Sequence, residues 1–263
     1  MKFNKKYLTA FLTLVVFGIA GFAVWNSAQS KNIDRVFIEN KTRALIVESV
    51  KDLDIGGDRS LFEVTLKNNC EKPISYYRLN ISDDSTKKGE LSGVERGGLT
   101  DGWTLKPNET STSRFSAAQT GKVFLVIAAL LFEDGTGDGD ANNLSSLQEI
   151  RSGVVLGFQK IIPFIKEETK TSDSLATESA IGELEMKVQQ FDEKDIPDVF
   201  KRGFALAKGY VKFELQDLRE KMGRKPGFDA IEEFSAKVAA MESRLLKLST
   251  NPFSNNNKKG GKN

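Results

Sequence analysis

The hydrophobic pattern of this chain changes its period once, near residue 140, and this change constrains the fold more than any other feature. From about 43 to 132, apolar and polar residues alternate, which is typical of half-buried β-strands. After 142, apolar residues recur every three or four positions, which is typical of amphipathic helices. We therefore expect an α+β protein with a β-sandwich domain at 36–142 and a helical region at 143–250.

Two segments, 61–68 and 74–82, carry the clearest alternation. The segment 43–51 also alternates, which places Val50 on the face opposite to Leu45. At 102–115 a Pro-Asn turn separates two further strands. Short strands with turn signals between them predict an antiparallel sandwich. The inward positions of the two clearest segments are expected to be Phe62, Val64, Leu66, Tyr77, Leu79 and Ile81.

The run KVFLVIAALLF at 122–132 is apolar after its first residue. Such an unbroken run is typical of a central strand that is covered on both faces. A membrane-spanning helix is excluded here, because a run of this length is too short to cross a bilayer.

Two stretches, FEVTLKNNCEKPI at 62–74 and WTLKPNET at 103–110, resemble the immunoglobulin-like accessory domains of bacterial envelope proteins. In those domains a V-x-L-x-N strand precedes a turn, and a Pro-Asn or Pro-Gly turn precedes another strand. The resemblance covers about residues 43–132 and implies a sandwich fold outside the cytoplasm. It implies no activity, because this fold hosts many functions. The paired cysteines of true immunoglobulin domains are absent, since Cys70 is the sole cysteine of the chain.

The helical region is expected to hold several helices, each with an apolar stripe. A polar linker lies at 167–178, a new helix is expected to start at 195–197, and a break between helices is expected at 223–227. Such helices are expected to form a small antiparallel bundle. An alternative is that a stripe serves as a coiled-coil surface for self-association or for a partner. The polar tail at 251–263 is expected to be disordered. The stripes are Leu147, Ile150, Val154, Phe158, Ile161 and Ile165; Ile181, Leu184, Val188 and Phe191; Phe200, Phe204, Ala207, Val211, Leu215, Leu218 and Met222; and Phe228, Ile231, Phe234, Val238, Met241, Leu245 and Leu248.

The first 30 residues predict export. Three lysines precede an apolar stretch at 7–25, which is long enough to span a bilayer as a signal anchor. The expected location is a bacterial cell membrane, with a single pass and the body outside the cytoplasm. The alternative is a signal peptide cleaved near GFA at 21–23, which would leave a secreted or periplasmic protein. A bacterial source is favoured because secreted eukaryotic domains usually carry disulfides.

Composition excludes several classes of function. The chain has no histidine, which removes Ser-His-Asp and Cys-His catalysis and every histidine-ligated metal site. The formal net charge is +2, which gives no basis for binding nucleic acid. A carboxylate-only carbohydrate-active enzyme stays open, because two acids suffice for that chemistry. The adjacent acid pairs are Asp83 with Asp84, Glu133 with Asp134, and Glu167 with Glu168.

The stretch FEDGTGDGD at 132–140 is the one candidate metal site. Asp134, Asp138, Asp140 and Asn142 fall on ligand positions of a calcium loop, with Gly139 at its turn. The closing glutamate of that loop is replaced by Ser145, so we expect weak calcium binding or none. The alternative is a strand-to-helix turn in which Asn142 or Asn143 caps the next helix.

The function expected from these features is a non-enzymatic, membrane-tethered binding or scaffold protein of the bacterial envelope. No catalytic residue and no cofactor other than calcium is expected. The partners expected are an unidentified protein, the membrane through residues 7–25, and a second copy of the chain. The alternatives are a calcium-dependent adhesion or sensor module that uses residues 134–142, and the carboxylate-only enzyme.

Overall fold

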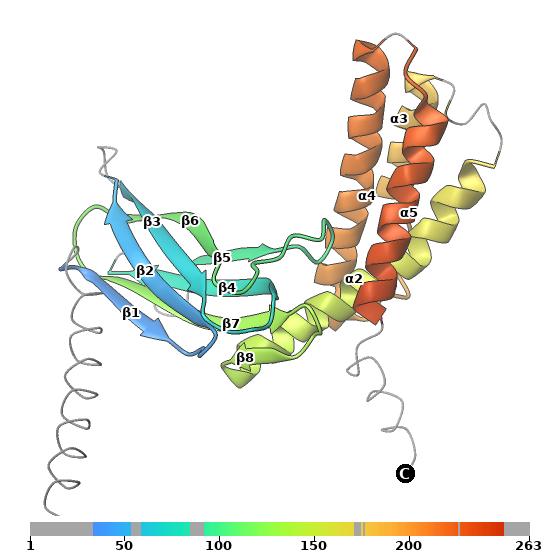
Figure 1. Ribbon diagram of the computed structural model, residues 1–263. Helices are drawn as coiled ribbons and strands as arrows, with labels where there is room; N and C mark the ends of the chain where they lie inside the picture. The colour runs from blue at the N-terminus through green and yellow to red at the C-terminus, as the bar shows by residue number, and fades with distance from the viewer. Residues whose placement is uncertain are drawn as a thin grey trace, which may run out of the picture.

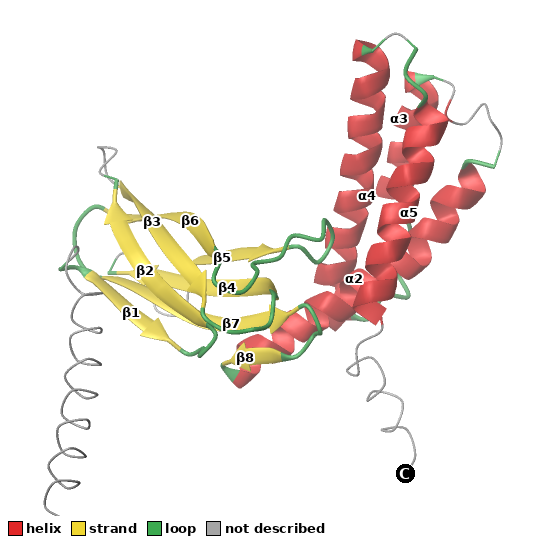
Figure 2. Cartoon of the chain, viewed as in Figure 1, coloured by secondary structure: helices red, strands yellow, loops and turns green. Residues whose placement is uncertain are grey.

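The computed structural model describes residues 34–53, 59–84, 92–170, 175, 177–225 and 227–249. These residues form two β-sheets and four helices, an α+β arrangement in which the sheets lie at one end and the helices rise from the other (Figures 1 and 2). The expected anchor at 7–25 and the expected tail at 251–263 lie outside the described residues. Among the helices that are described, none combines the length and the apolar character needed to cross a membrane.

The first sheet has the strand order β1-β7-β4-β5, with the short β8 paired to β7. The second sheet has the order β2-β3-β6. All described strand pairs are antiparallel except β1 with β7, so the expectation of a wholly antiparallel arrangement was wrong for this pair. No short turn joins β1 to β7, so no hairpin fixes their relative direction. The strands are β1 Val36–Asn40, β2 Leu45–Asp52, β3 Arg59–Asn68, β4 Ile74–Asp83, β5 Ser92–Gly97, β6 Thr110–Ala118, β7 Val123–Phe132 and β8 Gly137–Gly139.

The two sheets share one hydrophobic core. All six residues expected to face inward on β3 and β4 are buried, which confirms the alternation. Tyr77 also buries its hydroxyl, which lies 3.1 Å from Ser111 Oγ and 2.8 Å from Ser113 Oγ on β6. These bonds join the two sheets through the core, and they remove the cost of burying an unpaired hydroxyl.

The alternation on β2 is interrupted. A β-bulge lies between Val47 and Ser49, where the pairing with β3 shifts by one residue. Because the bulge reverses the phase, Val50 packs on the same core as Leu45. The expectation that these two residues face opposite ways was therefore wrong.

Strand β7 has the same kind of interruption, and it divides the strand in two. The pairing with β4 shifts between Ile127 and Ala129, so Ala128 is the extra residue. On the outer face of the sheet, Ala129 and Leu131 are fully buried under the helices, but Phe124 is 41% exposed. The expectation of a strand covered on both faces is confirmed for its second half and wrong for its first half.

The helices gather at the covered end of the first sheet, where α2 packs on β7 and the others rise beyond it (Figure 1). Their core includes Ala129 and Leu131 of β7, together with Tyr76 of β4 and Leu99. The central packing is between α2 and α4, with α3 and α5 beside them. The helices are α2 Ala141–Glu168, α3 Glu178–Gln189, α4 Asp198–Arg224 and α5 Ala230–Ser249.

Glycines allow α2 and α4 to approach closely. A Cβ atom at Gly203 would lie 1.9 Å from the carbonyl oxygen of Ile150, and one at Gly153 would lie 2.3 Å from that of Phe200. Any side chain at either position would collide with the backbone of the other helix. The two glycines therefore set the helix separation, which the apolar stripes do not reveal.

Most residues of the expected stripes are buried or half-buried in the helical core. Ile231 was placed wrongly, because it is 51% exposed at the start of α5. Phe191 lies beyond the end of α3, where its ring packs against Phe164 and Phe204. Within the expected linker, Leu175 is buried, so this segment contributes to the core.

The turn that contains Cys70 is organised by Asn68, which is fully buried. The Asn68 side-chain amide donates to the carbonyl oxygens of Lys72 and Leu105, each at 2.9 Å. Its oxygen accepts from the backbone N–H of Cys70 at 3.1 Å. The half-buried thiol donates to the same oxygen, so Cys70 belongs to the turn structure.

Candidate functional site

The acidic stretch at 132–140 forms a hairpin between β7 and β8. Asp134 lies in the turn, where its carboxylate accepts from the backbone N–H of Thr136 at 2.9 Å and from Lys72 Nζ at 2.7 Å. Burial alone would raise the pKa of Asp134, but the bonds from Lys72 and Thr136 outweigh it and hold the pKa below its ordinary value. The first candidate ligand is thus already bonded to a cation.

The other acidic candidates have different partners. Asp138 Oδ2 accepts from the backbone N–H groups of Arg43 and Ala44, at 2.5 and 3.1 Å, and so joins β8 to the loop before β2. Asp140 Oδ1 accepts from the backbone N–H groups of Asn142 and Asn143, each at 3.1 Å. Asp140 is therefore the N-cap of α2, and these bonds lower its pKa.

The helix cap differs from the expected one. Because α2 begins at Ala141, Asn142 and Asn143 lie inside its first turn, and neither can occupy the cap position. Each of the three aspartates bonds a different segment, and no group of three or more metal-ligating side chains was found in the described part of the chain. Calcium binding at Asp134, Asp138, Asp140 and Asn142 stays a prediction.

The adjacent acid pairs also divide between partners. The carboxylate of Asp83 accepts from the N–H of Ala118 and that of Asp84 accepts from the N–H of Lys122, each at 2.7 Å. At the end of α2, Glu167 pairs with Lys170, which follows the helix, and Glu168 pairs with Lys187 of α3. These four carboxylates therefore already have partners in the fold.

A polar network joins the first sheet to the helices, and Glu95 on β5 is its centre. The Glu95 carboxylate accepts from Tyr76 Oη at 2.6 Å, from Arg78 Nε at 2.7 Å and from Arg202 Nη2 of α4 at 2.5 Å. Arg78 also reaches the start of α2, where it donates to Asn143 Oδ1 at 3.3 Å. Burial would raise the pKa of Glu95, but these donors outweigh it and keep its pKa below the ordinary value.

Two buried arginines tie the end of α5 to its neighbours. Arg244 donates to the carbonyl oxygens of Leu99 and Gly98, and Arg151 of α2 donates to that of Leu248 at 3.3 Å. Burial, followed by the nearby charge of Arg244, lowers the pKa of Arg151 to about 10. A carbonyl in the last turn of a helix suits a cation.

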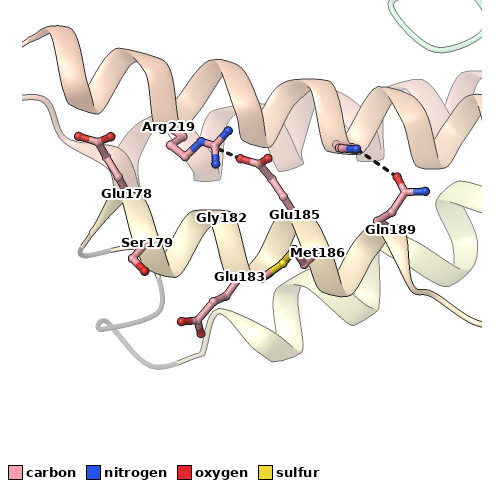
Figure 3. A pocket seen from close by; sticks show the side chains of 9 residues that line it. Glu178, Ser179, Gly182, Glu183, Glu185, Met186, Gln189 and Arg219 are labelled. Carbon is pink, nitrogen blue, oxygen red and sulfur yellow. Dashed lines mark hydrogen bonds and ion pairs between the residues drawn. The ribbon is translucent and has the colours of Figure 1, made fainter.

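A shallow cleft of about 480 Å³ lies between α3 and α4 (Figure 3). On its floor Glu185 is 7% exposed, and its Oε1 lies 3.2 Å from Arg219 Nε. This distance is that of an ion pair, but Oε1 accepts no hydrogen bond there, so the geometry of the pair is poor. Lys212 donates to Gln189 across the same cleft at 3.2 Å. Both contacts run between the two helices, and the cleft lacks a paired base and nucleophile among its lining residues.

The outer face of α4 carries an exposed apolar stripe. Val199, Leu206 and Phe213 are 54%, 41% and 63% exposed. They recur every seven residues along α4, in a row beside the buried Gly203 and Ala207. Gly209 lies between Leu206 and Phe213, and a Cβ atom there would meet no atom within 4 Å. We name Val199, Leu206 and Phe213 the α4 stripe.

Sequence reasoning assigned the buried side of α4 and overlooked the α4 stripe. The sequence does contain the α4 stripe as a second apolar repeat. Leu206 comes one residue before the buried Ala207, and Phe213 comes two residues after the buried Val211. This repeat was hidden because three residues spaced by seven are a small fraction of a 27-residue helix. Exposure in the structure distinguishes the two repeats.

Comparisons with known proteins assign no family to this chain. No family model and no curated protein matches it. The solved structures that share part of it include two targets of the Northeast Structural Genomics Consortium. Target SoR45 is 18% identical over 37% of this chain and 81% of that one, with a TM-score of 0.26. A second target, described as an ApaA protein of Bordetella pertussis, is 15% identical over 38% and 87%, with a TM-score of 0.23. Scores this low support no inference about fold or function.

Proposed function

We propose that this chain is a non-enzymatic, membrane-tethered protein of the bacterial envelope that binds a protein partner through the α4 stripe. The exposure of the α4 stripe is the observation that supports this function. Three large apolar residues recur on one helix face that no described element covers. Exposed apolar surface of this kind is characteristic of interaction sites.

The chemistry of the α4 stripe selects a partner that presents an amphipathic helix. A seven-residue apolar spacing matches the seam of a coiled coil, in which each side chain fits between residues of the facing helix. Gly209 supplies a gap between Leu206 and Phe213 where a partner side chain can approach the α4 backbone. Glycine in the middle of an exposed helix costs about 1 kcal/mol relative to alanine, which close approach of a partner would offset.

The location and the fold family remain part of the same proposal. The lysine-flanked stretch at 7–25 supports a single-pass anchor with the body outside the cytoplasm, and cleavage near 21–23 would give a secreted or periplasmic form. Two sheets that share a core, with a Pro-Asn turn before β6, support an immunoglobulin-like sandwich at 43–132.

Photocrosslinking in native membranes tests the binding surface. The full chain carries a benzophenone side chain in place of Phe213, and a matched variant carries it in place of Leu246 on α5, which is 65% exposed. We expect one discrete adduct from position 213 and none from 246, joined to an apolar position of a helix in another protein. Adding Leu206→Glu is expected to abolish the adduct.

Three results would overturn the proposal. These are no adduct at 213, equal adducts from both positions, or an adduct that survives Leu206→Glu. An adduct joined only to a second copy of this chain would replace the scaffold role with self-association. Circular dichroism of each variant separates loss of binding from loss of folding.

A further inference from the structure

A second exposed apolar surface lies on the first half of the outer face of the first sheet. It consists of Phe37 on β1 and Phe124 on β7, which are 45% and 41% exposed. The rings of Phe37 and Phe124 lie directly across the parallel pair, with centroids 5.5 Å apart and planes at 27°. Ile38 pairs with the buried Leu125 and so belongs to the other face of the sheet. We name Phe37 and Phe124 the bare patch. The helices that cover Ala129 and Leu131 do not extend over it.

The surroundings of the bare patch combine aromatic and cationic groups. Lys122 places its Nζ 5.4 Å from the centroid of the Phe37 ring. The nearest acid on β1, Glu39, lies 3.7 Å from Lys41 Nζ. Aromatic rings with neighbouring lysines are characteristic of surfaces that lie at the boundary between lipid headgroups and acyl chains.

The position of the bare patch in the chain identifies what can cover it. Phe37 is twelve positions after Trp25, where the expected anchor ends, and the described chain starts at Asp34, nine positions after it. A chain of nine residues spans at most about 32 Å, even fully extended. A tether of this length keeps β1 close to the membrane surface.

We propose that the bare patch lies against the lipid bilayer, so that Phe37 and Phe124 insert among the headgroups while Lys122 faces anionic lipid. The inference rests on the proposed membrane tether and adds a second contact to it. A second copy of the chain is a poorer occupant. Pairing through the free edge of β1 would use backbone groups and leave uncovered the two rings, which stand on the face of the sheet.

A spin-label measurement tests this contact in the full chain. Cys70 is the sole cysteine, so a Cys70→Ser background accepts a single nitroxide at Phe124→Cys or at Phe37→Cys. The matched control is Phe213→Cys on α4. Each variant is placed in nanodiscs of phosphatidylcholine and phosphatidylglycerol, and collisions with oxygen and with an aqueous nickel chelate are measured.

We expect the labels at 124 and 37 to lose collisions with the nickel chelate and to gain collisions with oxygen, as for a depth of about 5–10 Å in the interface. The label at 213 is expected to stay open to the chelate. Replacing phosphatidylglycerol with phosphatidylcholine, or Lys122 with Glu, is expected to reduce the protection.

The failures are distinguishable. If the chain floats with vesicles but the labels at 124 and 37 collide freely with the chelate, the bare patch does not touch lipid and the tether stands. If the chain does not float with vesicles, both the tether and this contact fail. Dipolar broadening between labels at 37 on two chains, with no oxygen gain, would assign the bare patch to self-association and overturn the proposal.

Discussion

The two halves of β7 differ in what covers them, although they belong to one strand and one face of one sheet. Ala129 and Leu131 are fully buried beneath the helical layer, whereas Phe124 is 41% exposed. The strand is apolar throughout, so its composition does not distinguish the halves. The difference comes from α2. This helix begins at Ala141, directly after β8, and packs over the second half of β7.

The largest expected effect comes from Gly203→Val, which disrupts the packing of α2 and α4 and therefore the helices that cover the second half of β7. The new side chain would overlap the carbonyl oxygen of Ile150, so α2 and α4 could not keep their separation. We expect the free energy of unfolding to fall by about 3 kcal/mol or more, because the clash is with backbone that cannot rotate away.

Urea denaturation followed by circular dichroism measures this loss. The control is Gly209→Ala on the same helix, where nothing obstructs a Cβ atom. Alanine there is expected to raise stability by about 0.5–1 kcal/mol through helix propensity. Equal effects of the two substitutions would contradict the close crossing of the helices.

A direct comparison uses one alanine substitution in each half of the outer face. Leu131→Ala leaves a cavity beneath the helices and is expected to cost about 2–5 kcal/mol. Phe124→Ala removes a ring that is already partly in water. We expect it to lower the free energy of unfolding by about 1 kcal/mol or less. Thermal or urea unfolding of both variants in detergent, away from lipid, checks the difference, and similar losses would show that the halves are equally covered.

The acid dependence of stability tests the polar link beneath the covered half. Because donors from Tyr76, Arg78 and Arg202 hold the pKa of Glu95 below 4.5, its ordinary value, the folded state binds a proton less readily than the unfolded chain. The stabilisation is complete above about pH 4.5 and is lost as pH falls through the lower folded value.

Glu95→Gln is expected to lower stability at neutral pH by about 1–3 kcal/mol, because Arg78 loses its charged partner. It should also flatten the fall in stability below pH 4.5. Unfolding curves at several pH values measure both effects. If wild type and variant lose stability in parallel on acidification, Glu95 does not carry this link.

The smallest expected effect concerns the start of the covering helix. Asp140→Ala removes the N-cap of α2 and should cost about 1 kcal/mol. Because Asp134, Asp138 and Asp140 already bond three different segments, we expect the same cost with calcium or with chelator. A rise in the melting midpoint on adding calcium, abolished by Asp140→Ala, would instead support the calcium loop.

The amino-acid sequence by itself determined the order of strands before helices, most of the core and the place where the period changes. These features follow from side-chain periodicity, which is local, so Phe62, Val64 and Leu66 could be assigned inward without knowing their partners. The same reasoning failed at Val50, because a β-bulge reverses the phase at one position and leaves no mark in composition.

Only the tertiary structure decided which apolar surfaces are covered. Leu131 and Phe124, or Phe204 and Phe213, are equally apolar in sequence and differ in what packs on them. Coverage depends on where α2 crosses the sheet and on the backbone contact between Gly153 and Gly203, which join residues far apart in the chain. Contacts of that kind are set by three-dimensional packing, so the α4 stripe and the bare patch could be identified only from the folded chain.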